Sequence, residues 1–288
     1  MAVEISICSF SFHRMLGEGK CDIFEYIRLS KELGATQLQP WNAHFTRAAD
    51  AAEVEKLGKS PGFPDLPAWL APPTDEGYLR EIKAAADEAG MPFESIAVDK
   101  AHIYEDEPQK RAVNRKFAYL WLDIAEMLGA GSVRIDAGGP EDMPDDVFAV
   151  IVEGYNDVIA RAADKGIRVL TENHWGPSRI PENVVKLLEG IDGLGFLFDT
   201  NNWAEGQRDK GWDLCAKRAD ATHVKTFAFD ENGNEPSVDI PRAIRMVLDA
   251  GYAGVWGVES CPRDGDEIEG ARKTIALIRR TLAECGIE

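Results

Sequence analysis

One pattern of hydrophobic and polar positions recurs along the chain: an amphipathic helix, a glycine, a short apolar strand and then polar residues. The stretches that show it are LSKELGATQLQPW, AADEAGMPFESIAVD, AEMLGAGSVRIDAGG, AADKGIRVLTENH, LLEGIDGLGFLFDTNN and VLDAGYAGVWGVES. A glycine directly after a helix can adopt the left-handed conformation that ends it. Two further strands are predicted in EISICSFSF and DATHVKTFAF, which brings the expected number of strands to eight.

The helices between these strands have the period of a surface helix that buries one face. One of them has a single apolar stripe, formed by Val113, Phe117, Leu120, Ile124 and Leu128. The last helix, predicted from about Asp266 to Glu284, has a comparable stripe of Ile268, Ala271, Ile275, Ile278 and Leu282. Strands that alternate with single helices form a parallel sheet with right-handed crossovers.

Eight strand–helix units in 288 residues favour an α/β fold with a single (β/α)8 TIM barrel, in which residues 1–288 form one domain. An open doubly wound sheet is the alternative. Such a sheet usually has a GxGxxG phosphate loop after its first strand, and SFSFHRMLGEGK does not match it. One connection is long, at about 41–74, with a short helix predicted at about 47–57. We expect this loop over the barrel mouth, as a lid or binding loop or as a subunit contact.

Charge and composition narrow the class of function. The net charge of −18 argues against nucleic acid as a partner, because proteins that bind phosphate backbones normally carry a basic face. No apolar run is long enough to predict a membrane span, and MAVEISICSFSF is predicted to be a strand and not a signal peptide. The five scattered cysteines form no CxxC motif, which is typical of the reducing cytosol. We therefore expect a cytoplasmic protein without a thiolate metal cluster.

Polar or ionisable residues follow nearly every predicted strand. In chain order they are His13, Gln39, Trp41, Asp99, His102, Asp136, Glu172, Asn173, His174, Asp199, Asn202, His223, Lys225 and Glu259. The carboxyl ends of the strands in a closed barrel meet at its mouth, where the active sites of such barrels lie. Helix capping would explain one or two of these residues but not all of them.

The last four strands supply the residues that we call the metal quartet: Glu172, Asp199, His223 and Glu259. Three carboxylates in one dry pocket would repel each other, and a divalent cation would remove that repulsion. Two glutamates, one aspartate and a neutral histidine suit Mn²⁺, Mg²⁺ or Co²⁺, with Zn²⁺ as a further alternative. Any one of the carboxylates could equally be a helix cap or half of an ion pair. The four together predict one divalent metal ion.

Strand parity adds two expectations, because side chains two residues apart share a face. Lys225 should point the same way as His223, where it would steady a substrate oxygen or an enolate, or else form an ion pair with Asp199 or Asp136. Arg134 and Asp136 should share a face, and a structural ion pair between them is expected.

The motifs TENHWG, FDTNN, THVKT and GVES resemble those of the xylose-isomerase-like TIM barrels, specifically the sugar phosphate isomerase/epimerase family, over nearly the whole chain. The resemblance implies that the metal quartet holds one divalent ion, usually manganese or a similar ion, and that Glu172 and Glu259 are catalytic residues that move protons. Two departures concern the substrate. Thr226 stands where many members have an acidic residue, and Asn202 stands where some epimerases have histidine. The identity of the sugar therefore does not transfer.

A DNA-repair endonuclease branch of the same family has three zinc ions and many more histidines. This chain has five histidines and a strongly acidic composition, which argue against that branch. The resemblance leaves the oligomeric state open, with a homo-oligomer (a dimer or tetramer) among the alternatives because relatives often form them.

The predicted activity is that of a divalent-metal-dependent isomerase or epimerase of a ketose, keto-sugar or cyclitol. Proton abstraction next to a carbonyl would give a metal-bound enediolate; one of Glu172 and Glu259 would remove the proton, and the other would return one to the opposite face or to the adjacent carbon. The alternative is a metal-dependent lyase or dehydratase that acts by β-elimination on a keto-sugar, inosose or 3-keto-glycoside. A third class, a non-catalytic sugar-binding or partner subunit, is disfavoured by the complete quartet.

A wall that faces a small-molecule sugar is expected around the metal, because aromatic faces pack on the C–H surfaces of sugars and imidazoles bind hydroxyls. The residues predicted for substrate binding are His13, Trp41, His102, His174, Trp175, Asn202 and Lys225. The aromatic residues Phe63 and Trp69 of the long loop would suit a larger glycoside.

Overall fold

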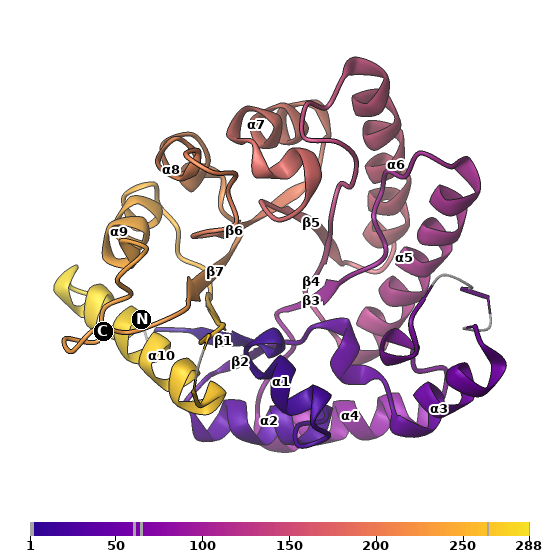
Figure 1. Cartoon of the computed structure of the whole chain (residues 1–288), viewed down its shortest axis with the longest axis horizontal. Helices are drawn as coiled ribbons and strands as arrows, with labels where there is room; N and C mark the ends of the chain where they lie inside the picture. Colours follow the sequence, from indigo (N-terminus) through magenta and orange to yellow (C-terminus); the bar gives the residue numbers. More distant parts are fainter. Residues whose placement is uncertain (1–2, 60–61, 64–65, 264, 288) are drawn as a thin grey trace.

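The protein is described by a computed structural model that covers residues 3–59, 62–63, 66–263 and 265–287. Eight parallel strands form one sheet in the order β2-β1-β8-β7-β6-β5-β4-β3. Their bounds are β1 Ile5–Cys8, β2 Gln37–Gln39, β3 Ser95–Val98, β4 Ser132–Ile135, β5 Arg168–Glu172, β6 Gly195–Asp199, β7 Ala221–Thr226 and β8 Trp256–Ser260. The fold is the predicted (β/α)8 TIM barrel (Figure 1).

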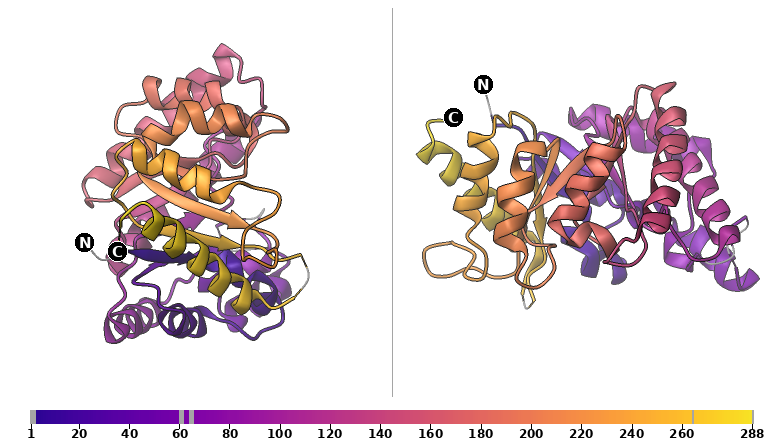
Figure 2. Two further views of the ribbon diagram at one scale, coloured as in Figure 1. Left: turned by 90° about the vertical axis from the view of Figure 1, so that its left-hand side faces the viewer. Right: turned by 90° about the horizontal axis from the view of Figure 1, so that it is seen from above.

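Helices surround the strands on the outside, as Figures 1 and 2 show from three directions. They are α1 His13–Gly17, α2 Ile23–Glu32, α3 Ala48–Leu57, α4 Glu76–Ala89, α5 Pro108–Leu128, α6 Asp145–Ala163, α7 Pro181–Gly190, α8 Arg208–Cys215, α9 Ile240–Asp249 and α10 Glu267–Glu284. Short 3-10 turns are η1 Ser9–Phe12, η2 Asn42–Phe45, η3 Ala68–Leu70, η4 Gly176–Arg179 and η5 Ala216–Arg218. Within the described ranges, no helix combines the length and the apolar character that a membrane crossing requires.

Local sequence sets the helix boundaries. The side chains of Asp75 and Asp266 accept hydrogen bonds from the first backbone N–H groups of α4 and α10, which satisfies donors that a helix start leaves unpaired. Gly90 and Gly129 end α4 and α5 in the left-handed conformation, with φ of 69° and 71°. The last helix, α10, spans Glu267–Glu284, as predicted to within one residue.

The buried face of α5 differs from the predicted stripe. Phe117 is buried as expected, but Val113 and Leu120 remain partly exposed. Trp121 is fully buried and makes an edge contact with Phe45 of η2, with ring centroids 5.3 Å apart. Trp121 therefore belongs to the buried face of α5, although the predicted stripe did not include it, and Leu120 packs against the core while partly exposed.

The long connection after β2 contains more regular structure than predicted. Helix α3 confirms the expected short helix, and η2 and η3 stand on either side of it. Trp69 of η3 packs on Trp41, with ring centroids 5.6 Å apart. Positions 60–61 and 64–65 of this predicted loop lie outside the described residues. Its role as a lid or a subunit contact stays a prediction.

The barrel closes between β2 and β3 through a seam that differs from the other strand contacts. In the described part of the chain, isolated parallel bridges join Leu38 to Phe93 and Trp41 to Ala97. Every other pair of neighbouring strands shares a continuous ladder. The seam thus has fewer paired residues than any ladder of the sheet.

A histidine in η2 is expected to make the fold sensitive to acid. His44 is fully buried, its Nδ1 lies 3.0 Å from Ser9 Oγ, and burial lowers its pKa to about 3. The unfolded chain binds a proton near pH 6.5 and the folded chain does not, so stability is complete above that pH and is lost as the pH falls. At pH 5 the loss is about 2 kcal/mol.

Urea unfolding at pH 7.5 and pH 5.0 in the presence of a chelator checks this. His44→Asn keeps a polar group near Nδ1 but cannot titrate. Its stability should fall less than that of the wild type between the two pH values, by about 2 kcal/mol. Equal pH dependence in the two proteins would contradict the assignment.

Candidate metal centre

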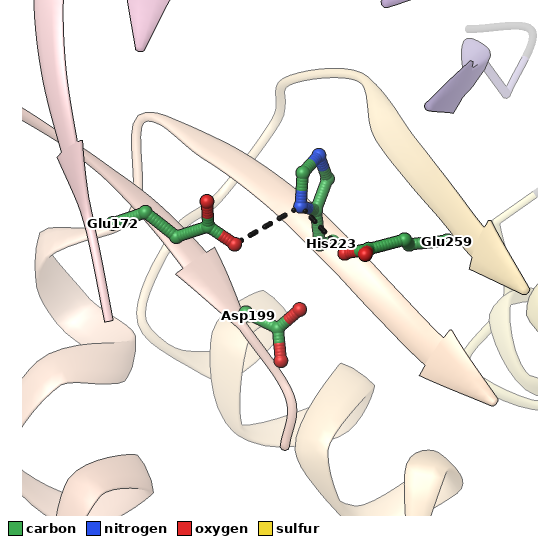
Figure 3. A group of neighbouring side chains, drawn as sticks. All are labelled: Glu172, Asp199, His223 and Glu259. Carbon is green, nitrogen blue, oxygen red and sulfur yellow. Dashed lines mark hydrogen bonds and ion pairs between the residues drawn. The ribbon is translucent and has the colours of Figure 1, made fainter. Parts of the chain in front are cut away.

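The structure brings the metal quartet together. One potential ligand atom from each of Glu172, Asp199, His223 and Glu259 lies within 4.8 Å of all the others, and all four residues are buried. His223 Nδ1 lies 3.2 Å from Glu172 Oε1 and 3.0 Å from Glu259 Oε2. Figure 3 shows the two glutamates approaching His223 from opposite sides, with Asp199 between them.

Strand parity explains why these side chains meet inside the barrel. Leu170, Leu197 and Ala221 form a small apolar cluster separate from the main core. Each of these residues lies two positions before a member of the quartet on β5, β6 and β7, so the acid or histidine points to the same face one layer higher. The apolar cluster is therefore the floor of the polar site.

Each glutamate of the quartet has its own basic partner. Arg134 Nε lies 3.0 Å from Glu172 Oε2, and Lys225 Nζ lies 2.8 Å from Glu259 Oε1. Burial alone would raise the pKa of both carboxyls. The charges of His174, Arg134 and His223 outweigh burial at Glu172, and its pKa falls below its ordinary value.

At Glu259, Lys225 and His223 outweigh burial, and the pKa lies well below its ordinary value. Both glutamates are therefore held as carboxylates near neutral pH.

Asp199 has one satisfied and one unsatisfied oxygen. The backbone N–H groups of Asn201 and Asn202 donate to its Oδ1, at 2.6 and 2.8 Å. The buried Oδ2 has no hydrogen-bond partner among the described residues, and burial raises the pKa of Asp199 to about 7. A carboxylate oxygen in this position needs a cation or a proton. The donor set fits a divalent ion that would contact all four residues.

The pKa of His223 points the same way. Burial would lower it, but Cys8, Glu172 and Glu259 together outweigh burial, and the pKa lies well above its ordinary value. The geometry thus stabilises positive charge at the centre of the quartet. A metal ion would supply that charge and leave the imidazole neutral, as metal ligation requires.

Strand parity predicted Lys225 and Arg134 correctly as inward-facing residues, with one difference in pairing. Arg134 Nη1 forms the expected ion pair with Asp136, at 3.0 Å from Oδ2. Lys225 pairs with Glu259 and not with Asp199 or Asp136, because β7 and β8 align Lys225 directly opposite Glu259. The prediction did not include the cross-strand register.

A cavity of about 150 Å³ opens onto three members of the quartet, Glu172, His223 and Glu259. Among the residues predicted for substrate binding, those that line it are Trp41, His174, Trp175 and Lys225. It is also lined by Ala97, Asp99 and Arg134, which the substrate-binding prediction did not include, and by Cys8 and Phe10, which the sequence reasoning missed. Cys8 and Phe10 lie at the end of β1 and shortly after it, whereas the predicted residue, His13, lies further along the chain.

The other three predicted wall residues do not line this cavity, and each has a partner of its own. His13 stacks on Phe10, with ring centroids 4.5 Å apart. His102 Nδ1 lies 3.7 Å from Glu105 Oε1. The side-chain amide of Asn202 donates to Glu172 Oε1 at 3.4 Å. Their contact with a substrate stays a prediction.

A larger cavity of about 640 Å³ lies beside the loops after β7 and β8, away from the quartet. The buried carboxylate in its lining, Glu235, accepts hydrogen bonds from the backbone N–H groups of Phe227, Ala228 and Ser237. That carboxylate is occupied by bonds that hold the loop after β7 in place.

Fold and site together define a (β/α)8 barrel with a buried glutamate, aspartate and histidine cluster suited to a divalent ion at its mouth. The chain belongs to the xylose isomerase-like TIM barrel family, whose sequence profile matches residues 27–281.

Three comparisons with individual proteins place this membership in context. Sixty-eight residues are 37% identical to the C-glycoside deglycosidase alpha subunit of Arthrobacter globiformis, and the match covers 22% of this chain and 19% of that protein. The fold is similar to D-psicose 3-epimerase from Clostridium cellulolyticum (TM-score 0.71, 13% identity, 97% of this chain and 99% of that one). It is also similar to 3-keto-D-glucoside 4-epimerase from E. coli (TM-score 0.65, 15% identity), and that match covers 90% of this chain and 94% of the other.

Proposed function

We propose that this protein is a divalent-metal-dependent isomerase or epimerase of a ketose, keto-sugar or cyclitol. The observation that carries the proposal is the pair of ionised glutamates, Glu172 and Glu259, which face each other across His223 in one buried site. Two carboxylates on opposite sides of a bound carbon can remove a proton from one face and return it to the other.

The metal quartet would hold the ion through one atom of each residue. A bound divalent ion withdraws electron density from a carbonyl oxygen and so makes the neighbouring C–H bond acidic. This contribution matters because the paired glutamates, with lowered pKa values, are weak bases. We propose that one glutamate takes the proton and the other returns one, either to the opposite face or to the adjacent carbon.

The cavity supports a small, hydroxyl-rich substrate. Its volume of about 150 Å³ lies well below the range of about 300–1,000 Å³ that is typical of drug-sized ligands. Trp41 and Trp175 present indoles to it, and His174 and Lys225 present polar groups. The names of two proteins of similar fold, D-psicose 3-epimerase and 3-keto-D-glucoside 4-epimerase, agree with a sugar that carries a carbonyl group.

Deuterium uptake tests this proposal. The protein would be loaded in turn with Mn²⁺, Mg²⁺, Co²⁺ and Zn²⁺ and incubated in D₂O with ketoses, inososes and 3-keto-glycosides. After removal of the ion, NMR should find deuterium at the carbon beside the carbonyl of at least one compound, with the carbon skeleton intact. Metal-loaded protein that exchanges no proton in the whole set would contradict the proposal.

A second candidate is a lyase that starts with the same proton abstraction and then expels a leaving group from the β-carbon. The local match to a C-glycoside deglycosidase subunit favours it. So does Trp69, which is 51% exposed and packs on Trp41 beyond the cavity, where a second ring of a glycoside would lie. Release of an alkene or an aglycone in the D₂O experiment identifies this activity.

A further inference from the structure

A second acidic group lies beside the metal quartet. It consists of Asp99, Asp136 and His174, and one ligand atom of each lies within 4.8 Å of the other two. Asp99 and His174 line the same cavity as three members of the quartet. Two carboxylates and an imidazole at this spacing would suit a metal ion of their own. The negative charge of the two carboxylates must be balanced by a cation or by a basic side chain.

The guanidinium of Arg134 already lies against both carboxylates of the second acidic group. Its Nη1 is 2.9 Å from Asp99 Oδ1 and 3.0 Å from Asp136 Oδ2. Asp136 is fully buried and Arg134 is only 4% exposed. The remaining carboxylate contact of Asp136 is with His174 Nδ1, at 3.1 Å from Oδ2. The arginine thus holds the position that a second cation would take.

The same guanidinium also reaches the quartet, through the ion pair of its Nε with Glu172 Oε2 at 3.0 Å. One side chain therefore contacts three carboxylates from two groups. Arginine suits this role because its fork is planar, offers several donors in fixed directions and stays charged at any relevant pH. Oε2 of Glu172 lies on the side of Arg134, in an ion pair without a hydrogen bond, and Oε1 faces His223.

We propose that Arg134 is a positioning residue that takes the place of a second metal ion. It fills the second acidic group, so that the site holds one ion and not two, and it orients Glu172 within the quartet. The inference relies on the proposed function only in assigning one divalent ion to the quartet.

Arg134→Met tests this directly, because methionine is similar in length but has no charge. Loss of the guanidinium leaves the second acidic group without a cation, and a divalent ion should bind there. After loading with Mn²⁺ and gel filtration, elemental analysis should find about one ion per chain in the wild type and about two in Arg134→Met. Electron paramagnetic resonance of the bound Mn²⁺ should change accordingly.

Two further variants sharpen the result. Arg168→Met removes an exposed arginine that pairs with Asp220, and it should keep one ion. Arg134→Met combined with Asp136→Asn removes a donor of the second acidic group and should return the stoichiometry to one. Two ions in the wild type, or one ion with an unchanged spectrum in Arg134→Met, would overturn the inference. A wild type that binds no ion would instead contradict the quartet itself.

Arg134→Lys covers the case in which the methionine variant does not fold. A single ammonium group keeps the charge but cannot contact all three carboxylates in the same way. This variant should bind one ion with an affinity lowered roughly 10- to 100-fold, the usual effect of losing an outer partner of a metal ligand. Wild-type affinity in Arg134→Lys would show that Glu172 does not depend on the fork geometry, and would overturn the positioning role.

Discussion

Replacement of Glu172 or Glu259 by glutamine is expected to abolish nearly all turnover. Glutamine has nearly the same shape but cannot accept the proton, and a positioned carboxylate contributes about 10²–10⁴-fold to rate. Each residue would also lose an anionic ligand oxygen, so the two effects act in the same direction. The measurement is the rate of deuterium uptake or product formation at saturating metal, on the substrate found in the D₂O screen.

Glu94→Gln is the matched control for these variants. Glu94 precedes β3 at the opposite end of the barrel, where its Oε2 accepts a hydrogen bond from Ser6 at 2.8 Å. Burial raises its pKa to about 7, so neutral glutamine should be well tolerated there and turnover should stay close to that of the wild type. Turnover near the wild-type rate in Glu172→Gln or Glu259→Gln would remove that residue from the proton-transfer role.

Removal of divalent ions by a chelator is expected to reduce activity to background, and readdition of a single ion type should restore it. The quartet places three carboxylates around one histidine, and without an ion the substrate carbonyl has no counter-charge there. Loss of the ion should also lower thermal stability. A ligand at a hundred times its dissociation constant stabilises the fold by about 2.7 kcal/mol, or roughly 5 °C in a chain of this size.

The strength of metal binding should depend on pH in a defined direction. Burial raises the pKa of Asp199 to about 7, so this ligand binds a proton below that pH and releases it above. An ion must displace the proton, and its affinity should therefore rise from pH 6 to pH 8. Titration calorimetry at the two pH values checks this.

For the chelation experiment, an unchanged melting temperature and unchanged activity after exhaustive chelation would rule out a resident ion.

The sequence predicted the fold and the quartet well because both follow from short-range regularities. The alternation of strands and helices defines the barrel, and the strand-end rule then brings Glu172, Asp199, His223 and Glu259 to one place. The sequence pattern did not predict which residues would pair with these four. The ion pair of Lys225 with Glu259 depends on the register between β7 and β8, which periodicity does not encode.

The same limit applies to the arginine on β4. Parity predicts that Arg134 faces Asp136, but its contacts with Asp99 and Glu172 come from the neighbouring strands β3 and β5. Such a three-way contact becomes visible only once the strands are assembled in space. The fully buried Trp121 was missed for a related reason, since the regular stripe on α5 did not take account of the aromatic ring of Phe45.

The uneven closure of the barrel implies that its two sides differ in mobility. The strands that carry the quartet, β5 to β8, belong to one uninterrupted ladder, whereas the strand before Trp41 is joined to β3 only by isolated bridges. Amide protons should therefore exchange with solvent sooner along the β2–β3 border than around the metal quartet. Such a division would let the side of the cavity at Trp41 change shape while the relative positions of the quartet residues stay fixed.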